Sequence, residues 1–68
     1  MLNMLYWAVF GYTGSHALAT SAVELVRSRT SGTRYREEAY SIEYEYPRRR
    51  VSIFYQGEAV QGWELGDE

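Results

Sequence analysis

The chain has 68 residues, a formal net charge of −2 and no cysteine, and all seven of its basic residues are arginine. The lack of cysteine excludes disulfides and thiolate metal sites, and a single histidine, His16, cannot build a zinc site without several carboxylates. The negative charge argues against a dedicated duplex-DNA binder, because neutralising phosphate requires a cationic surplus.

The first predicted element is a buried strand over residues 2–10, "LNMLYWAVF", which is continuously apolar and is followed by the turn residues "GYTGS". Both of its faces would be apolar, which is typical of a central or doubly covered strand. The same segment makes a poor signal peptide, because no basic residue precedes it and the apolar run ends directly after it, at Gly11. We therefore expect a soluble, cytoplasmic protein with no membrane partner.

The second predicted element is an amphipathic helix that begins at His16. Five apolar residues recur at the spacing of one helical stripe: Leu18, Ala19, Ala22, Leu25 and Val26. Ser15 is a suitable N-cap, and Gly32 could take the left-handed conformation that ends the helix. Arg27 and Arg29 fall in the last turns, where the helix dipole favours cations.

A β-hairpin is predicted next, because apolar and polar residues alternate over residues 40–46 and again over 51–56. Proline cannot adopt the positive φ that a two-residue hairpin loop requires at its first position. A four-residue loop from Pro47 to Arg50 avoids that conflict and places apolar residues opposite one another. The expected cross-strand pairs are Tyr46 with Val51, Tyr44 with Ile53, and Ile42 with Tyr55.

A short last strand could follow a tight turn at Gly57 and Glu58, which would pair Tyr55 with Val60. Trp63 would then lie on the same sheet face as Phe54. The predicted fold class is α+β, in the order β-α-β-β with a possible fourth strand, and one helix covers a small, mainly antiparallel sheet. A single domain spans residues 1–68, and residues 66–68 are expected to fray.

The charged residues come in blocks, and the arginine triplet Arg48–Arg50 at the predicted hairpin tip has three interpretations. It could be a solvated turn, a fork-shaped contact to carboxylates of a protein partner, or a nucleic-acid contact. Nearby Glu43 and Glu45 would repel phosphate. A solvated turn is therefore the first interpretation, a protein contact the second and nucleic acid the third.

The sheet face that the helix leaves uncovered is a second candidate surface. It would expose Phe54 and Trp63 beside Glu43 and Glu45, and exposed aromatic patches on small proteins often mark interfaces. Alternatively, Trp63 folds back and completes the core.

No residue pattern predicts catalysis or a cofactor. Ser15 and His16 are neighbours in the sequence, so the imidazole does not face the hydroxyl in the manner of a catalytic triad, and no acid is placed to orient it. Glu37 and Glu38 are adjacent on a strand and would point to opposite faces. We expect a protein that is not an enzyme, with no metal and no cofactor.

The size and layout resemble those of small phage-encoded proteins that act against host defences, such as anti-CRISPR proteins. The resemblance rests on the strand "LYWAVF", the helix "SHALATSAVELVRSRT" and the hairpin "YSIEYEYPRRRVSIFY". It implies a non-enzymatic inhibitor, located in the host cytoplasm, that occupies a surface of a larger protein or nucleoprotein complex. The layout is also similar to that of dodecins, flavin-binding oligomers, although no tryptophan lies on the strand after the helix.

The leading hypothesis is therefore a protein-binding inhibitor module. Its candidate contact residues are Arg48, Arg49, Arg50, Glu43, Glu45, Phe54 and Trp63. The first alternative is a homo-oligomer that closes its second sheet face on itself, with or without a small ligand between the copies. The second alternative is a nucleic-acid-binding module. Direct nucleic-acid binding ranks last.

Overall fold

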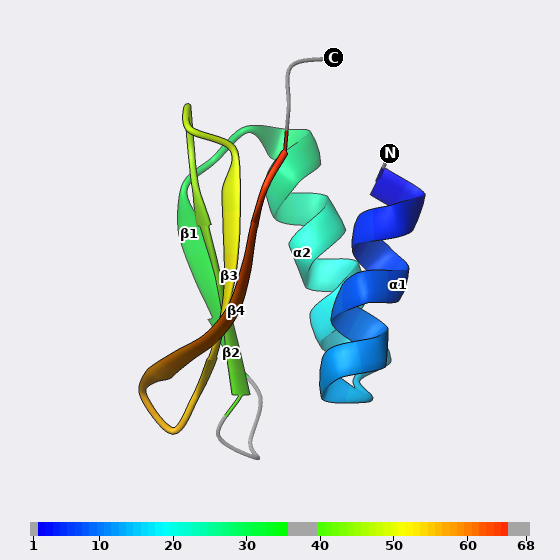
Figure 1. The fold of residues 1–68 in the computed structure, drawn as a ribbon. Coiled ribbons are helices and arrows are strands. Elements are labelled where there is room, and N and C mark those ends of the chain that lie inside the picture. Colours follow the sequence, from blue (N-terminus) through cyan, green and yellow to red (C-terminus); the bar gives the residue numbers. More distant parts are fainter. Residues whose placement is uncertain (1, 36–39, 66–68) are drawn as a thin grey trace.

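The computed structural model describes residues 2–35 and 40–65, which form two helices and a four-stranded antiparallel sheet (Figure 1). The chain order is α1 (Leu2–Thr13), α2 (His16–Ser28), β1 (Gly32–Tyr35), β2 (Tyr40–Glu45), β3 (Arg50–Tyr55) and β4 (Glu58–Glu64). Each strand pairs with the next along the chain, so the sheet order is β1-β2-β3-β4. The predicted α+β class and the fourth strand are confirmed. The fraying expected for residues 66–68 lies outside the described residues.

The predicted strand over residues 2–10 is wrong, because this segment is the helix α1. Its apolar residues lie on every side, so periodicity could not separate a strand from a buried helix. The helix continues past Phe10 to Thr13, and Gly14 ends it at a φ of 69° while its amide donates to the Phe10 carbonyl oxygen at 2.7 Å. Gly14 and Ser15 are the only residues between α1 and α2, so the two helices form a tight helical hairpin.

The helix α2 begins where the sequence predicts. The Ser15 hydroxyl accepts a hydrogen bond from the Leu18 amide at 3.1 Å, as an N-cap does. All five predicted stripe residues are buried. The predicted end at Gly32 is wrong, because Arg29 takes the left-handed conformation at a φ of 55° and Gly32 is the first residue of β1.

The hairpin between β2 and β3 forms, but its register differs by two residues from the predicted one. Glu45 pairs with Arg50, Tyr44 with Val51 and Ile42 with Ile53, so the four loop residues are Tyr46–Arg49. A shift of two residues keeps every side chain on its original face, so the apolar pattern could not distinguish the two registers. The observed register places Glu45 opposite Arg50, which is a favourable pair of opposite charges.

The turn between β3 and β4 also differs from the predicted one. Gln56 and Gly57 form the two-residue loop, with φ values of 52° and 86°, and Tyr55 pairs with Glu58 instead of Val60. An irregularity between Ile53 and Phe54 then shifts the register of β4. Because of this shift, Trp63 pairs with Val51 and lies on the helix-facing side, opposite to the expected side.

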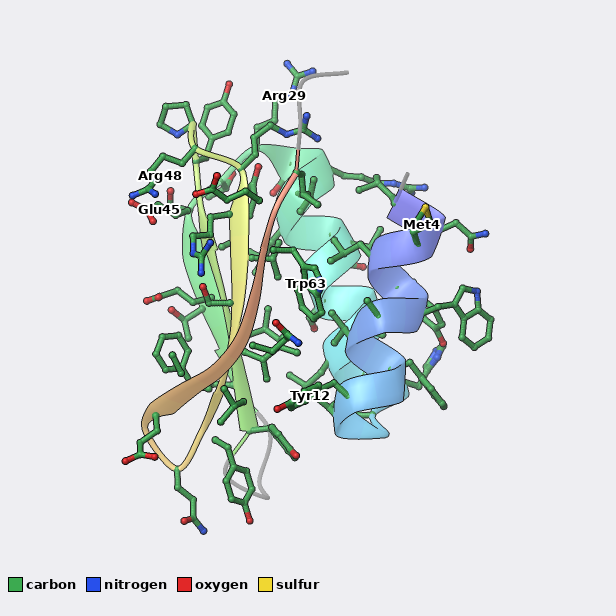
Figure 2. All side chains as sticks on the ribbon, viewed as in Figure 1. Met4, Tyr12, Arg29, Glu45, Arg48 and Trp63 are labelled. Carbon is green, nitrogen blue, oxygen red and sulfur yellow. The ribbon has the colours of Figure 1, made fainter. Side chains whose placement is uncertain are left out.

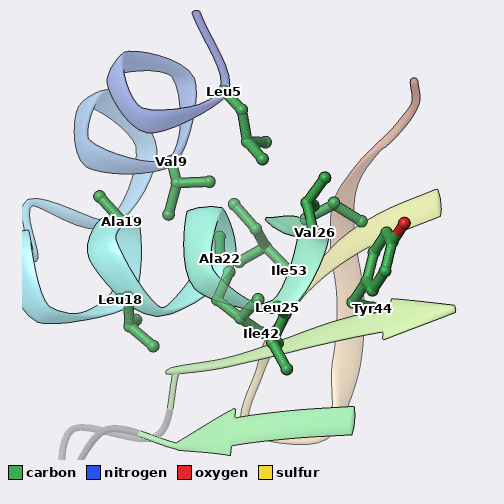
Figure 3. Packing of buried hydrophobic residues seen from close by; sticks show 11 residues of the cluster. Leu5, Val9, Leu18, Ala19, Ala22, Leu25, Val26, Ile42, Tyr44 and Ile53 are labelled. Atoms are coloured by element: carbon green, nitrogen blue, oxygen red, sulfur yellow. The ribbon is translucent and has the colours of Figure 1, made fainter. Parts of the chain in front are cut away.

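The core lies between the helical layer and one face of the sheet (Figure 3). α2 packs on β1 and β2, and α1 packs beside α2. The Tyr12 hydroxyl of α1 donates to the Val60 carbonyl oxygen of β4 at 3.3 Å. This hydrogen bond joins the helical layer to the sheet at β4. The buried residues are Leu5, Val9, Leu18, Ala19, Ala22, Leu25, Val26, Ile42, Tyr44, Val51 and Ile53.

Candidate functional site

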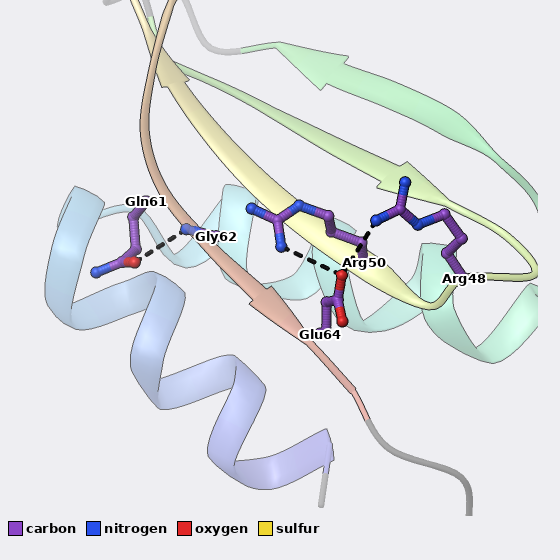
Figure 4. Close-up of polar contacts among 5 residues, drawn as sticks. All are labelled: Arg48, Arg50, Gln61, Gly62 and Glu64. Atoms are coloured by element: carbon purple, nitrogen blue, oxygen red, sulfur yellow. Dashed lines mark hydrogen bonds and ion pairs between the residues drawn. The ribbon is translucent and has the colours of Figure 1, made fainter.

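The arginine triplet is divided between two sites in the structure. Arg48 Nη2 lies 3.2 Å from Glu64 Oε2, and Arg50 Nη1 lies 3.7 Å from the same oxygen (Figure 4). These two arginines therefore join the hairpin to the last strand on the outer face of the sheet. The side chains of Arg48 and Glu64 are more than half exposed, so solvent weakens these ion pairs.

Arg49 belongs to a different site, a pocket of about 350 Å³ at one end of the molecule. We call this site the arginine pocket, and its lining residues are Leu2, Val26, Arg27, Arg29, Tyr46 and Arg49. Its three arginines thus come from two segments that are far apart in the sequence, the end of α2 and the loop between β2 and β3. No aspartate or glutamate lines the pocket among the described residues. Figure 2 shows Arg29 at this end of the molecule.

Hydrogen bonds to its backbone hold the loop between β2 and β3 beside the end of α2. The Ser31 hydroxyl accepts a hydrogen bond from the Tyr46 amide at 2.9 Å and donates to the Tyr46 carbonyl oxygen at 3.2 Å. The Leu65 amide donates to the Arg49 carbonyl oxygen at 2.8 Å. Both sides of the loop are therefore held by neighbouring segments, which positions Tyr46 and Arg49 toward α2.

Arg27 and Arg29 are exposed, and neither forms an ion pair with another described residue. The sequence pattern explained both as cations at the end of a helix, and Arg27 is indeed in the last turn of α2. Their juxtaposition with Arg49 could not be predicted, because it depends on where the hairpin loop lies. The arginine pocket is the candidate anion site of this protein.

The expected aromatic patch of Phe54 and Trp63 does not form. Phe54 pairs with Ala59 and lies on the outer face, whereas Trp63 lies between the sheet and the helices (Figure 2). Trp63 is partly buried and packs against the core. The outer face is mainly polar, with Glu43 and Glu45 exposed on it. Glu37 and Glu38, which the acidic block includes, lie outside the described residues.

A surface that sequence reasoning missed is the exposed side of α1. Met4 is 76% exposed and Trp7 is 60% exposed, although no charged residue occurs between positions 2 and 13. The sequence pattern did not predict this exposed side, because the segment was interpreted as a strand with both faces buried. The absence of charge along the whole segment was the signal that could have indicated it.

The described residues include no metal-ligand cluster, and Ser15 and His16 each have another hydrogen-bond partner. No group of three or more His, Cys, Asp or Glu residues among them could hold a metal ion. The Ser15 hydroxyl is occupied as the N-cap of α2, and a hydrogen bond joins the ring of His16 to the hydroxyl of Tyr6. Ser15 and His16 therefore serve separate structural contacts. Within residues 2–35 and 40–65, no helix is long and apolar enough to cross a bilayer.

Comparison of the chain with protein-family models, with curated proteins and with solved structures finds no significant match.

Proposed function

We propose that this chain is a small, non-enzymatic protein-binding module that inhibits a larger protein or nucleoprotein complex by occupying part of its surface. The arginine pocket supports this proposal, because three arginines line it and no aspartate or glutamate of the described residues does. Such a site attracts an anion, and arginine forks bind carboxylates in a two-point geometry.

The partner is proposed to present an acidic peptide segment to the pocket. Tyr46 is 42% exposed beside the arginines, and tyrosine is enriched where protein interfaces concentrate their binding energy. Nucleic acid is the less favoured ligand, because the chain is negative overall and Glu43 and Glu45 add acidic groups to the outer face. The outer face is too polar to support the alternative in which two copies pair through it.

A peptide-binding measurement tests this proposal. We expect a fluorescently labelled hexaglutamate peptide to bind the wild-type protein at low salt. The triple variant Arg27→Gln/Arg29→Gln/Arg49→Gln should weaken binding by about tenfold or more, because the charge-assisted hydrogen bonds are lost. The matched control is Arg48→Gln/Arg50→Gln, which removes arginines that face Glu64 and should change the affinity by less than about twofold.

Two results would overturn the proposal. One is the absence of peptide binding by the wild-type protein at low salt. The other is stronger binding of a short thymidine oligonucleotide than of the peptide, with a steep loss of affinity as salt rises, which would assign the pocket to nucleic acid.

A further inference from the structure

The exposed side of α1 forms an uncharged stripe, which we define as Met4, Trp7, Ala8 and Gly11. These positions follow the i, i+3, i+4, i+7 spacing that places residues along one side of a helix. Met4 and Trp7 are 76% and 60% exposed. A helix that is apolar on all sides is normally covered on all sides, yet within the described residues only one side of α1 is covered, by the core.

We propose that a second copy of this chain covers the stripe, which makes the protein a two-fold symmetric dimer through α1. This inference goes beyond the proposed function and uses none of the residues of the arginine pocket as its evidence. It is also separate from the alternative of pairing through the sheet, because the apolar surface lies on the helical layer.

Gly11 supplies the first argument for close packing by another helix. A β-carbon at this position would meet nothing within 4 Å, and its φ is not in the left-handed region. Glycine inside a helix lowers stability by about 0.5–1 kcal/mol relative to alanine, so the monomer gains nothing from it. A partner helix can approach closely at this point only because Gly11 has no side chain. Gly14 differs, because its positive φ of 69° explains it within the monomer.

The order of large and small residues along the stripe supplies the second argument. The large residues Met4 and Trp7 precede the small residue Gly11, and Ala8 lies between them. In an antiparallel pair related by a two-fold axis, Met4 faces Gly11 of the second copy and Trp7 faces Ala8. Each large side chain then meets a small one, as a self-complementary interface requires. A parallel pair would place large against large.

Trp7 is held in place before a partner arrives, which supports its role as an anchor. Its ring contacts those of Tyr6 and Phe10 edge-on, with centroid distances of 5.0 Å and 5.8 Å. A preorganised aromatic side chain loses little conformational entropy on binding.

The charge distribution favours a second copy over a charged partner or a lipid surface. Two chains of net charge −2 can meet through α1 without placing like charges together, because α1 has no charged residue. Helices that lie on anionic membranes carry basic residues on their polar side, and α1 has none. An interface built from one helix of 12 residues belongs to the small, transient class, so we expect a weak dimer with a dissociation constant of roughly micromolar order.

Sedimentation velocity from about 1 µM to about 1 mM should show a monomer–dimer equilibrium, because this range spans the expected affinity. Gly11→Gln should weaken the dimer by about tenfold or more, because its side chain occupies the space needed by the second helix. The melting temperature of the dilute Gly11→Gln monomer should be unchanged or higher, because glutamine favours the helix. The matched control Ala17→Gln, at an exposed position of α2, should leave the dimer unchanged.

Two outcomes would overturn the proposal. A wild-type protein that remains monomeric over the whole range has no such interface, and neutral phosphatidylcholine vesicles would then show whether the stripe binds lipid instead. A dimer that tolerates Gly11→Gln would have to form through another surface. Replacing the three arginines of the pocket should not affect dimerisation, so failure of one proposal leaves the other testable.

Discussion

Single residues in the core show how position decides the effect of a polar group. Tyr44 is 1% exposed, and its hydroxyl has no hydrogen-bond partner among the described residues. An unpaired polar atom in the core is unfavourable because it loses its hydrogen bonds to water. The ring itself is well placed, since Tyr44 pairs with Val51 on the buried face.

Replacing Tyr44 with phenylalanine should therefore keep or raise the stability of the protein. We expect the free energy of unfolding to rise by up to about 1 kcal/mol, because the variant removes a buried group that has no partner among the described residues. Urea denaturation followed by circular dichroism measures this change. Tyr40→Phe, at the half-buried end of β2, should have almost no effect. A clear loss of stability in Tyr44→Phe would mean that the hydroxyl has a partner after all.

At the scale of elements, local signals predicted the start of α2 and its buried stripe but misplaced its end and the turn between β3 and β4. The N-cap at Ser15 and the buried stripe of α2 follow from spacing within one helix, and both are confirmed. The hairpin of β2 and β3 was also predicted, but its register was not. Two registers that differ by two residues bury the same side chains, so the choice depends on the loop and on the pairing of Glu45 with Arg50.

The turn between β3 and β4 offers a prediction at this scale. Both Gln56 and Gly57 have positive φ, which defines a turn in which asparagine followed by glycine is preferred. Gln56→Asn should raise the free energy of unfolding by about 0.5 kcal/mol, because asparagine tolerates the left-handed region better than glutamine. Thermal unfolding monitored by circular dichroism tests this.

The matched variant Gly57→Ala should act in the opposite direction. It places a β-carbon on a residue with a φ of 86°, which should lower the free energy of unfolding by about 1–2 kcal/mol. Nothing lies within 4 Å of that position, so backbone strain alone would cause the loss. Equal stability of the two variants would argue against the assigned turn.

At the scale of the whole molecule, the two tryptophans have different roles. Trp63 lies between the layers (Figure 2) and packs against the core. Trp7, on α1, is mostly exposed. Trp63 and the hydrogen bond from Tyr12 both hold the helical layer to β4. Trp63 therefore contributes the aromatic packing between β4 and the helical layer.

Trp63→Ala should lower the free energy of unfolding by about 2 kcal/mol, because it removes half-buried aromatic packing between the layers. Phe54→Ala, on the outer face, is the control and should cost about 1 kcal/mol or less. Both values come from urea denaturation at low protein concentration. If Phe54→Ala were the more damaging change, Trp63 would not be part of the core.

The amino-acid sequence alone determined the α+β class, the helix α2 with its cap, and the presence of the hairpin, because each depends on residues close together in the chain. It did not determine α1, whose apolar residues on all sides suit either a buried strand or a helix. Tertiary structure decided that choice, because α2 provides a surface for Leu5 and Val9 while the four consecutive strands complete the sheet. Tertiary structure also divided the arginine triplet: Arg48 and Arg50 face Glu64, and Arg49 joins Arg27 and Arg29, since only the folded chain brings the hairpin loop to the end of α2.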